Sequence, residues 1–155
     1  MLEDGNSGVK YLIQRVDEWT NAQGRQARAR GLEYQLAGDH NRDAASDPRR
    51  AAGSLYSAIA PSPKVAPRIG SFNRSRILLN GHHVEHWLNG VKIVEFDTGT
   101  PEMQSFIAKV RFKKSDPNAP MVERSPISLQ NHGSETWFRD IKVRMPADSG
   151  ARLDR

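Results

Sequence analysis

The stretch from Arg76 to Asp97 decides the fold class, and its sequence is RILLNGHHVEHWLNGVKIVEFD. Two Asn-Gly pairs, Asn80-Gly81 and Asn89-Gly90, separate three short apolar runs. An Asn-Gly pair between apolar runs is a strong hairpin signal, because a type I′ turn needs positive φ at both central residues. The spacing therefore predicts a three-stranded antiparallel meander. Its strands are Ile77–Leu79, His83–Leu88 and Lys92–Phe96.

Short apolar runs and period-two alternation continue along the rest of the chain, and helical periodicity is nearly absent. The best helical candidate, Asp17–Ala29, is polar all round and is interrupted by Gly24. The segment Ala37–Gly53 is rich in Asp, Arg, Ala and Gly, which predicts a long surface loop. The remaining predicted strands are Val9–Val16, Leu32–Leu36, Ser54–Ile59, Phe106–Phe112, Ile127–Gln130 and Trp137–Val143.

These strands and turns predict an all-β fold, an antiparallel sandwich or closed barrel. The apolar share of 37% supports a modest core. In a sandwich of two packed sheets, an outer face can curve into a binding groove. A closed sandwich usually needs more strands than this pattern provides, so we expect some sheet partners to be missing from the chain.

The composition excludes several classes of protein. The chain has no Cys, which rules out a disulfide scaffold, thiol catalysis and Cys-ligated zinc. No apolar run approaches the length of a membrane span, and the first residues are acidic and polar rather than typical of a signal peptide. The net charge is +5, but the basic residues are interleaved with acidic ones. That pattern favours solvated loop charge over a nucleic-acid surface.

The first candidate site lies on the predicted strand Leu32–Leu36. Side chains alternate across a strand, so Tyr34 shares the core face with the two leucines, and Glu33 and Gln35 share the other face. A carboxylate and an amide side by side on an open face suit a polyhydroxylated ligand. The alternative is that both are ordinary polar residues facing solvent.

The second candidate site is the alternation of His83, Glu85 and Trp87 on one strand. An indole stacks its apolar face on a sugar ring while the polar groups take hydroxyls. The alternative places Trp87 in the core and the other two at a polar edge. The histidines at 82, 83 and 86 match no recognised zinc spacing, so the sequence predicts no histidine metal site.

The third candidate site combines Gln130 and His132, on one side of a strand, with Arg139. Imidazole suits proton transfer near neutral pH, and a guanidinium suits an oxyanion or a carboxylate. The sequence has no glycine-rich phosphate loop and no serine nucleophile elbow.

An ordered set of short motifs runs through the chain and resembles the 3-keto-disaccharide hydrolase domain family. Members of this family are bacterial proteins with a concanavalin-like jelly-roll fold. The motifs are NSG at 6–8, GLEYQ at 31–35, SLY at 54–56, HVEHWLNG at 83–90, ISLQNHG at 127–133 and WFRDI at 137–141.

The resemblance implies a jelly-roll domain over residues 5–145 that lacks its first strands, because the family has further strands before the first motif. Residues 146–155 are expected to form a disordered tail. The family also has Asn at the position that Asp140 occupies here. A periplasmic or extracellular location is suggested by the resemblance, although the chain carries no export signal.

The activity that the resemblance implies is hydrolysis of a glycosidic bond in a sugar already oxidised to a ketone at C3. Ordinary glycosidases use two carboxylates, whereas the strand at Glu33 offers one carboxylate and an amide. A 3-ketone acidifies the proton on C2, so one base could remove it before the leaving group departs and water adds. The expected catalytic residues are Glu33 and His132, and the expected substrate-binding residues are Gln35, Trp87, Asn89, Gln130 and Arg139.

Two other functions remain open from the sequence. A jelly roll also serves as a lectin scaffold, so a non-catalytic carbohydrate-binding module is the main alternative. A nucleic-acid-binding role is disfavoured by the charge pattern. No cofactor is predicted with certainty, and a divalent cation would find its best ligands at Glu33, Asp39 and His40.

Overall fold

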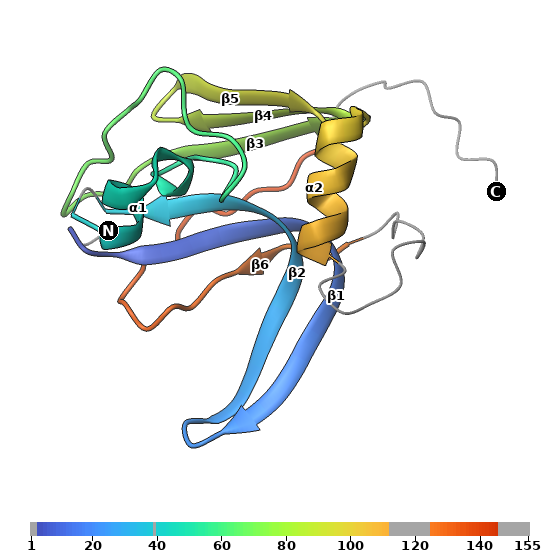
Figure 1. Ribbon diagram of the computed structural model, residues 1–155. Coiled ribbons are helices and arrows are strands. Elements are labelled where there is room, and N and C mark those ends of the chain that lie inside the picture. Colours follow the sequence, from blue (N-terminus) through green and yellow to red (C-terminus); the bar gives the residue numbers. More distant parts are fainter. Residues whose placement is uncertain (1–2, 39, 112–124, 146–155) are drawn as a thin grey trace.

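The structure is a computed structural model, and it describes residues 3–38, 40–111 and 125–145. Two antiparallel sheets pack against each other (Figure 1), which confirms the expected all-β sandwich. The first sheet has the order β2-β1-β6, and the second has the order β3-β4-β5. The first sheet contains β1 (Asn6–Asn21), β2 (Gly24–Ala37) and β6 (Ser128–Leu129). The second contains β3 (Ser75–Asn80), β4 (His83–Leu88) and β5 (Val91–Asp97).

The core lies between the two sheets and is built by alternation along the strands. On β4, the residues Val84, His86 and Leu88 are buried, and the residues between them are only half-buried. On β2, Leu32 and Tyr34 face the same core. Period-two patterning therefore brings side chains from both sheets into one apolar layer. Its buried members are Tyr11, Leu32, Tyr34, Leu36, Leu55, Val84, Val94, Phe96, Met103 and Ile107.

The predicted meander is confirmed, but its two turns differ. Asn89 and Gly90 have φ of 52° and 88°, as a type I′ turn requires. In the first turn, Asn80 pairs with His83, so the two loop residues are Gly81 and His82. Of these two, only Gly81 has positive φ, at 58°. The first turn is therefore not the type I′ turn that the Asn-Gly pair predicts.

The strand predicted at Phe106–Phe112 is wrong, because residues Pro101–Arg111 form the helix α2. Proline is favoured in the first turn of a helix, and the Thr100 hydroxyl accepts a hydrogen bond from the backbone N–H of Met103 at 3.3 Å. Met103 and Ile107, four residues apart, are buried against the core. Apolar and polar residues alternate over the few residues from Phe106 onward, which is typical of a strand. The residues that begin the helix, from Pro101, precede that stretch.

The segment predicted as a loop at Ala37–Gly53 contains two short helices, α1 (Arg42–Ser46) and the 3-10 helix η1 (Pro48–Arg50). Asn41 caps α1, because its side-chain oxygen accepts bonds from the N–H groups of the first turn. Within the ranges that the structure describes, no helix is long and apolar enough to cross a membrane.

Two further strand predictions are wrong. In place of a strand at Ser54–Ile59, Leu55 forms single bridges to Tyr34 and to Ile59 around a turn. Residues Trp137–Val143 form no strand, although their backbone is described. The missing partner strands and the boundary at residue 145 stay predictions, and the predicted tail at 146–155 lies outside the described residues.

The polar candidate helix Asp17–Ala29 belongs to the long hairpin of β1 and β2, whose end projects away from the second sheet (Figure 1). Ion pairs connect its two strands, with Arg30 to Asp17 at 2.5 Å and Arg25 to Glu18 at 2.7 Å. Cross-strand ion pairs of this kind stabilise the pairing of polar strands that do not pack against an apolar core.

A buried histidine joins the two sheets. The His86 side chain is fully buried, with Nε2 2.7 Å from the Tyr11 hydroxyl and Nδ1 2.9 Å from the Gly53 carbonyl oxygen. A carbonyl oxygen only accepts, so Nδ1 carries the hydrogen and Nε2 accepts from the hydroxyl. Burial lowers the pKa of His86 to about 4, against the opposing effect of the bond to Gly53. The neutral ring is the form that the fold requires.

We expect His86 to make the fold acid-sensitive. Its pKa is about 4 when folded and 6.5 in the reference state, so the unfolded chain binds more protons between these values. The free energy of unfolding should fall as pH drops from 6.5 to 4, by about 3 kcal/mol from this group. Denaturant unfolding at several pH values between 4 and 6.5 measures this change in the free energy of unfolding.

The His86→Phe variant should be less stable at neutral pH, because two buried polar groups lose their partner. Its stability should depend less on pH across the same range. His40→Asn, which removes an exposed histidine, is the control and should keep the wild-type slope. An unchanged slope in His86→Phe would contradict the assignment.

Candidate functional site

A hollow of about 680 Å³ lies against β1 and β2, on the side that Glu33 and Gln35 face. The helix α2 borders it through Phe106 and Val110. Its volume is within the range of small-molecule sites. The polar residues that line it are Asn6, Lys10, Arg28, Arg30, Glu33, Gln35, Tyr56, Ser57, Lys109, Gln130 and His132.

The hollow brings together four of the candidate residues, Glu33, Gln35, Gln130 and His132, from distant parts of the chain. The strand β6 pairs with β1 through Val9↔Leu129 and Lys10↔Ser128. Two hydrogen bonds continue this pairing. The Gln130 N–H donates to the Gly8 carbonyl oxygen at 2.8 Å, and the Ser7 hydroxyl donates to the Gln130 carbonyl oxygen at 2.7 Å.

The Glu33 carboxylate is buried in the wall of the hollow beside a lysine. Glu33 is 9% exposed, and its Oε2 lies 3.1 Å from Lys10 Nζ, on the residue paired with it across the strands. A glycine makes room for it, because a Cβ at Gly8 would lie 2.7 Å from Glu33 Oε1. Any larger residue at position 8 would clash with the Glu33 side chain, which explains the glycine of the NSG motif.

The two glutamines are held differently. Gln35 is fully buried, and its Nε2 donates to Asn6 Oδ1 at 3.0 Å. The Gln130 side-chain oxygen is buried and has no hydrogen-bond partner among the described residues. A buried acceptor without a partner is costly, so this oxygen is suited to accept a hydrogen bond from a ligand hydroxyl or from water.

The charge around the hollow is mainly positive. Four basic residues line it, and two of them have acidic partners, since Lys10 pairs with Glu33 and Arg30 pairs with Asp17. Of the described residues lining the hollow, Glu33 alone carries a carboxylate. Such a site stabilises negative charge that develops on a bound oxygen.

The structure places Trp87 and Asn89 on the second sheet, away from the residues lining the hollow. The Trp87 Nε1–H donates to Glu85 Oε2 at 2.7 Å, and the Arg76 guanidinium lies 5.3 Å from the ring centre. Asn89 forms the turn, where its Oδ1 accepts from the Arg74 N–H at 3.0 Å. Asn89 therefore has the turn position that the Asn-Gly pair predicts, and Trp87 has structural contacts that sequence patterning did not reveal.

Arg139 also lies apart from the residues lining the hollow. Its guanidinium carbon is 3.9 Å from the ring centre of Phe72, and its Nε is 3.8 Å from Asp140 Oδ2. The cation set proposed from sequence is likewise not assembled by its described members. Glu33 pairs with Lys10 and His40 pairs with Glu3 at 3.1 Å, while Asp39 lies outside the described residues.

Sequence reasoning missed Lys10 and the α2 residues Phe106 and Lys109. Lys10 could have been found, because alternation along the strand places it two residues after Gly8 on the same face. The α2 residues could not, because that segment was predicted to be a strand.

We expect Gly8→Ala to displace the Glu33 side chain and to lower the free energy of unfolding by about 1–3 kcal/mol, the usual range for overpacking. In a Glu33→Ala background the same substitution should have little effect, because the crowded atoms are gone. Denaturant unfolding of the four proteins in this double-mutant cycle measures the coupling. Equal losses in both backgrounds would show that Glu33 does not occupy this place.

Two known proteins are similar to this chain over most of its length. The curated 3-keto-disaccharide hydrolase of Bacteroides thetaiotaomicron is 28% identical, with 91% of this chain and 54% of the relative covered. A crystal structure from Parabacteroides distasonis, of a protein provisionally named a glycosyl hydrolase, matches with a TM-score of 0.58 and 26% identity. That match covers 86% of this chain and 60% of the other. The chain thus spans about half the length of the curated relative.

The family match extends over nearly all of the chain. Residues 1–144 match the family described as the 3-keto-alpha-glucoside-1,2-lyase-like domain. They include the NSG, GLEYQ and ISLQNHG motifs, which supply Gly8, Glu33, Gln35, Gln130 and His132. The residues lining the hollow beside β1 and β2 all lie within this match, and the chain belongs to the 3-keto-alpha-glucoside-1,2-lyase-like domain family.

Proposed function

We propose that the hollow binds a 3-keto-glycoside, such as a 3-keto-disaccharide, and that the chain hydrolyses its glycosidic bond. The observation that carries this proposal is that Glu33, which is buried, supplies the one carboxylate among the described residues lining the hollow, beside basic, neutral polar and apolar groups. A two-carboxylate glycosidase needs a second acid in the same place. Family membership and the name of the Bacteroides relative support the substrate class.

The chemistry needs one base because the substrate already holds a ketone. Glu33 would take the proton from C2, and the electron pair would move onto the C3 oxygen as an enolate. Collapse of the enolate expels the oxygen at C1, which takes a proton and leaves as the free alcohol. The sugar is then an enone between C1 and C3. Water adds at C1 and a proton returns to C2, so the net reaction is hydrolysis.

The neighbours of Glu33 suit the charges that this route creates. Lys10, 3.1 Å from the carboxylate, would lie near the developing enolate oxygen and stabilise it. The second lining lysine, Lys109 on α2, adds positive charge on the other side. His132 is exposed at the edge of the hollow, where a leaving group could receive a proton from an imidazole. The Gln130 oxygen would accept a bond from a sugar hydroxyl.

We expect Glu33→Gln to lower turnover of 3-keto-trehalose by about 10²–10⁴, the usual cost of losing a positioned base. The amide keeps the shape of the side chain but cannot take a proton. Released sugar gives the rate. The matched control is Glu18→Gln, which removes an exposed carboxylate of β1 and should leave turnover unchanged.

His132→Asn, measured in parallel, separates the roles of the two candidates. We expect a smaller loss than in Glu33→Gln, and a loss that shrinks for substrates with an acidic leaving group. Full activity of Glu33→Gln beside an inactive His132→Asn would move the base to His132. A protein that binds the sugar without turning it over would support the carbohydrate-binding module instead.

A further inference from the structure

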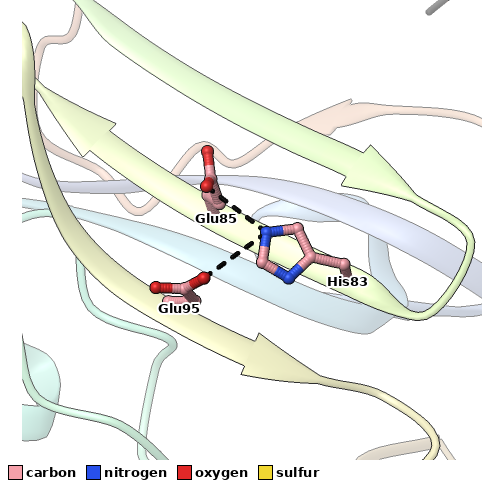
Figure 2. A group of neighbouring side chains, drawn as sticks. All are labelled: His83, Glu85 and Glu95. Carbon is pink, nitrogen blue, oxygen red and sulfur yellow. Dashed lines mark hydrogen bonds and ion pairs between the residues drawn. The ribbon is translucent and has the colours of Figure 1, made fainter.

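A second group of titratable side chains gathers on the outer face of the other sheet. His83 and Glu85 project from β4, and Glu95 projects from β5 beside them (Figure 2). Alternation explains the arrangement, since Val84 and His86 take the core face of β4. Glu85 and Glu95 are paired directly across the two strands. None of the three lines the hollow beside β1 and β2.

The ligand atoms of the three side chains converge on one point. His83 Nε2 lies 3.3 Å from Glu85 Oε1 and 3.6 Å from Glu95 Oε1, and all three atoms lie within 4.8 Å of one another. A tetrahedral ion with bonds of about 2.1 Å holds its ligands about 3.4 Å apart. The two distances from the imidazole therefore already match those around such an ion.

The two carboxylates of this cluster favour the binding of a cation. Carboxylates directly opposite each other on neighbouring strands repel. Lys92 compensates part of this, with Nζ 2.6 Å from Glu95 Oε2 and 3.5 Å from Glu85 Oε1. A register shift between His86 and Trp87 brings Lys92 onto the same face as Glu95. One ammonium against two carboxylates leaves a net negative charge facing the imidazole.

Glu85 is held in place as a ligand should be. Its second oxygen, Oε2, accepts the Trp87 indole N–H at 2.7 Å, so Oε1 is left to face His83. Outer hydrogen bonds of this kind orient and charge metal ligands.

We propose that His83, Glu85 and Glu95 form a binding site for a divalent transition-metal ion of the zinc class. One imidazole nitrogen with two carboxylate oxygens suits Zn²⁺ and Co²⁺, whereas Mg²⁺ and Ca²⁺ prefer oxygen alone. His83 and Glu95 are 42% and 49% exposed at their side chains, so water completes the coordination. The ion would connect β4 to β5 and stabilise the sheet.

The test is calorimetric titration of the protein with Zn²⁺ after treatment with a chelator. We expect one site, weakened about tenfold or more by His83→Asn and by Glu95→Gln. His40→Asn is the matched control, because His40 is an exposed histidine whose carboxylate partner among the described residues is Glu3. This variant should bind Zn²⁺ as tightly as the wild type.

Lys92→Met gives a prediction of opposite sign. Removing the ammonium that contacts both carboxylates frees their oxygens, so Zn²⁺ should bind more tightly. Unfolding temperatures with chelator present show whether each variant is folded, and added Zn²⁺ should raise the temperature of the wild type but not of His83→Asn. Zn²⁺ binding that both His83→Asn and Glu95→Gln leave intact, or no binding at millimolar Zn²⁺, would overturn the proposal.

Discussion

The two hydrogen bonds of His86 connect the parts of this molecule on which the rest depends. One runs to Tyr11 on β1, and the other runs to Gly53, whose N–H donates to the Gln35 carbonyl oxygen at 2.8 Å. Through them the second sheet is tied to the strand that presents Glu33 and Gln35. Both bonds use the neutral ring, because Nδ1 donates and Nε2 accepts. They satisfy the polar atoms of a side chain that is fully buried in an apolar core.

Much of the fold could be predicted from sequence because its signals are local. The meander at 76–97 follows from two turns and three alternating runs, and the structure confirms it. The failures are equally physical. The α2 segment alternates over a few residues, but Thr100 caps it and Met103 and Ile107 bury a helical face. The run Trp137–Val143 alternates too, yet a strand requires a partner, and the described part of the chain supplies none.

The candidate site was predictable only in part. Which face of a strand a side chain takes follows from its immediate neighbours in the sequence, whereas the meeting of side chains from different strands depends on the tertiary fold. Glu33 and Gln35 share a face by parity, and family motifs add Gln130 and His132. Nothing in the spacing shows that Lys109 of a helix completes the wall. The same limit applies to the cluster of His83, Glu85 and Glu95, since Glu95 lies beside His83 because β4 pairs with β5.

The central claim is that Glu33 removes the proton from C2 of a 3-keto sugar, and the fate of that proton tests it most directly. In D₂O, the keto sugar released by the protein should carry deuterium at C2. The hydrogen on C4 is equally adjacent to the ketone and reports spontaneous exchange, so it should stay largely unlabelled. Product with no deuterium at C2 beyond the level at C4 would contradict the account and indicate direct displacement at C1.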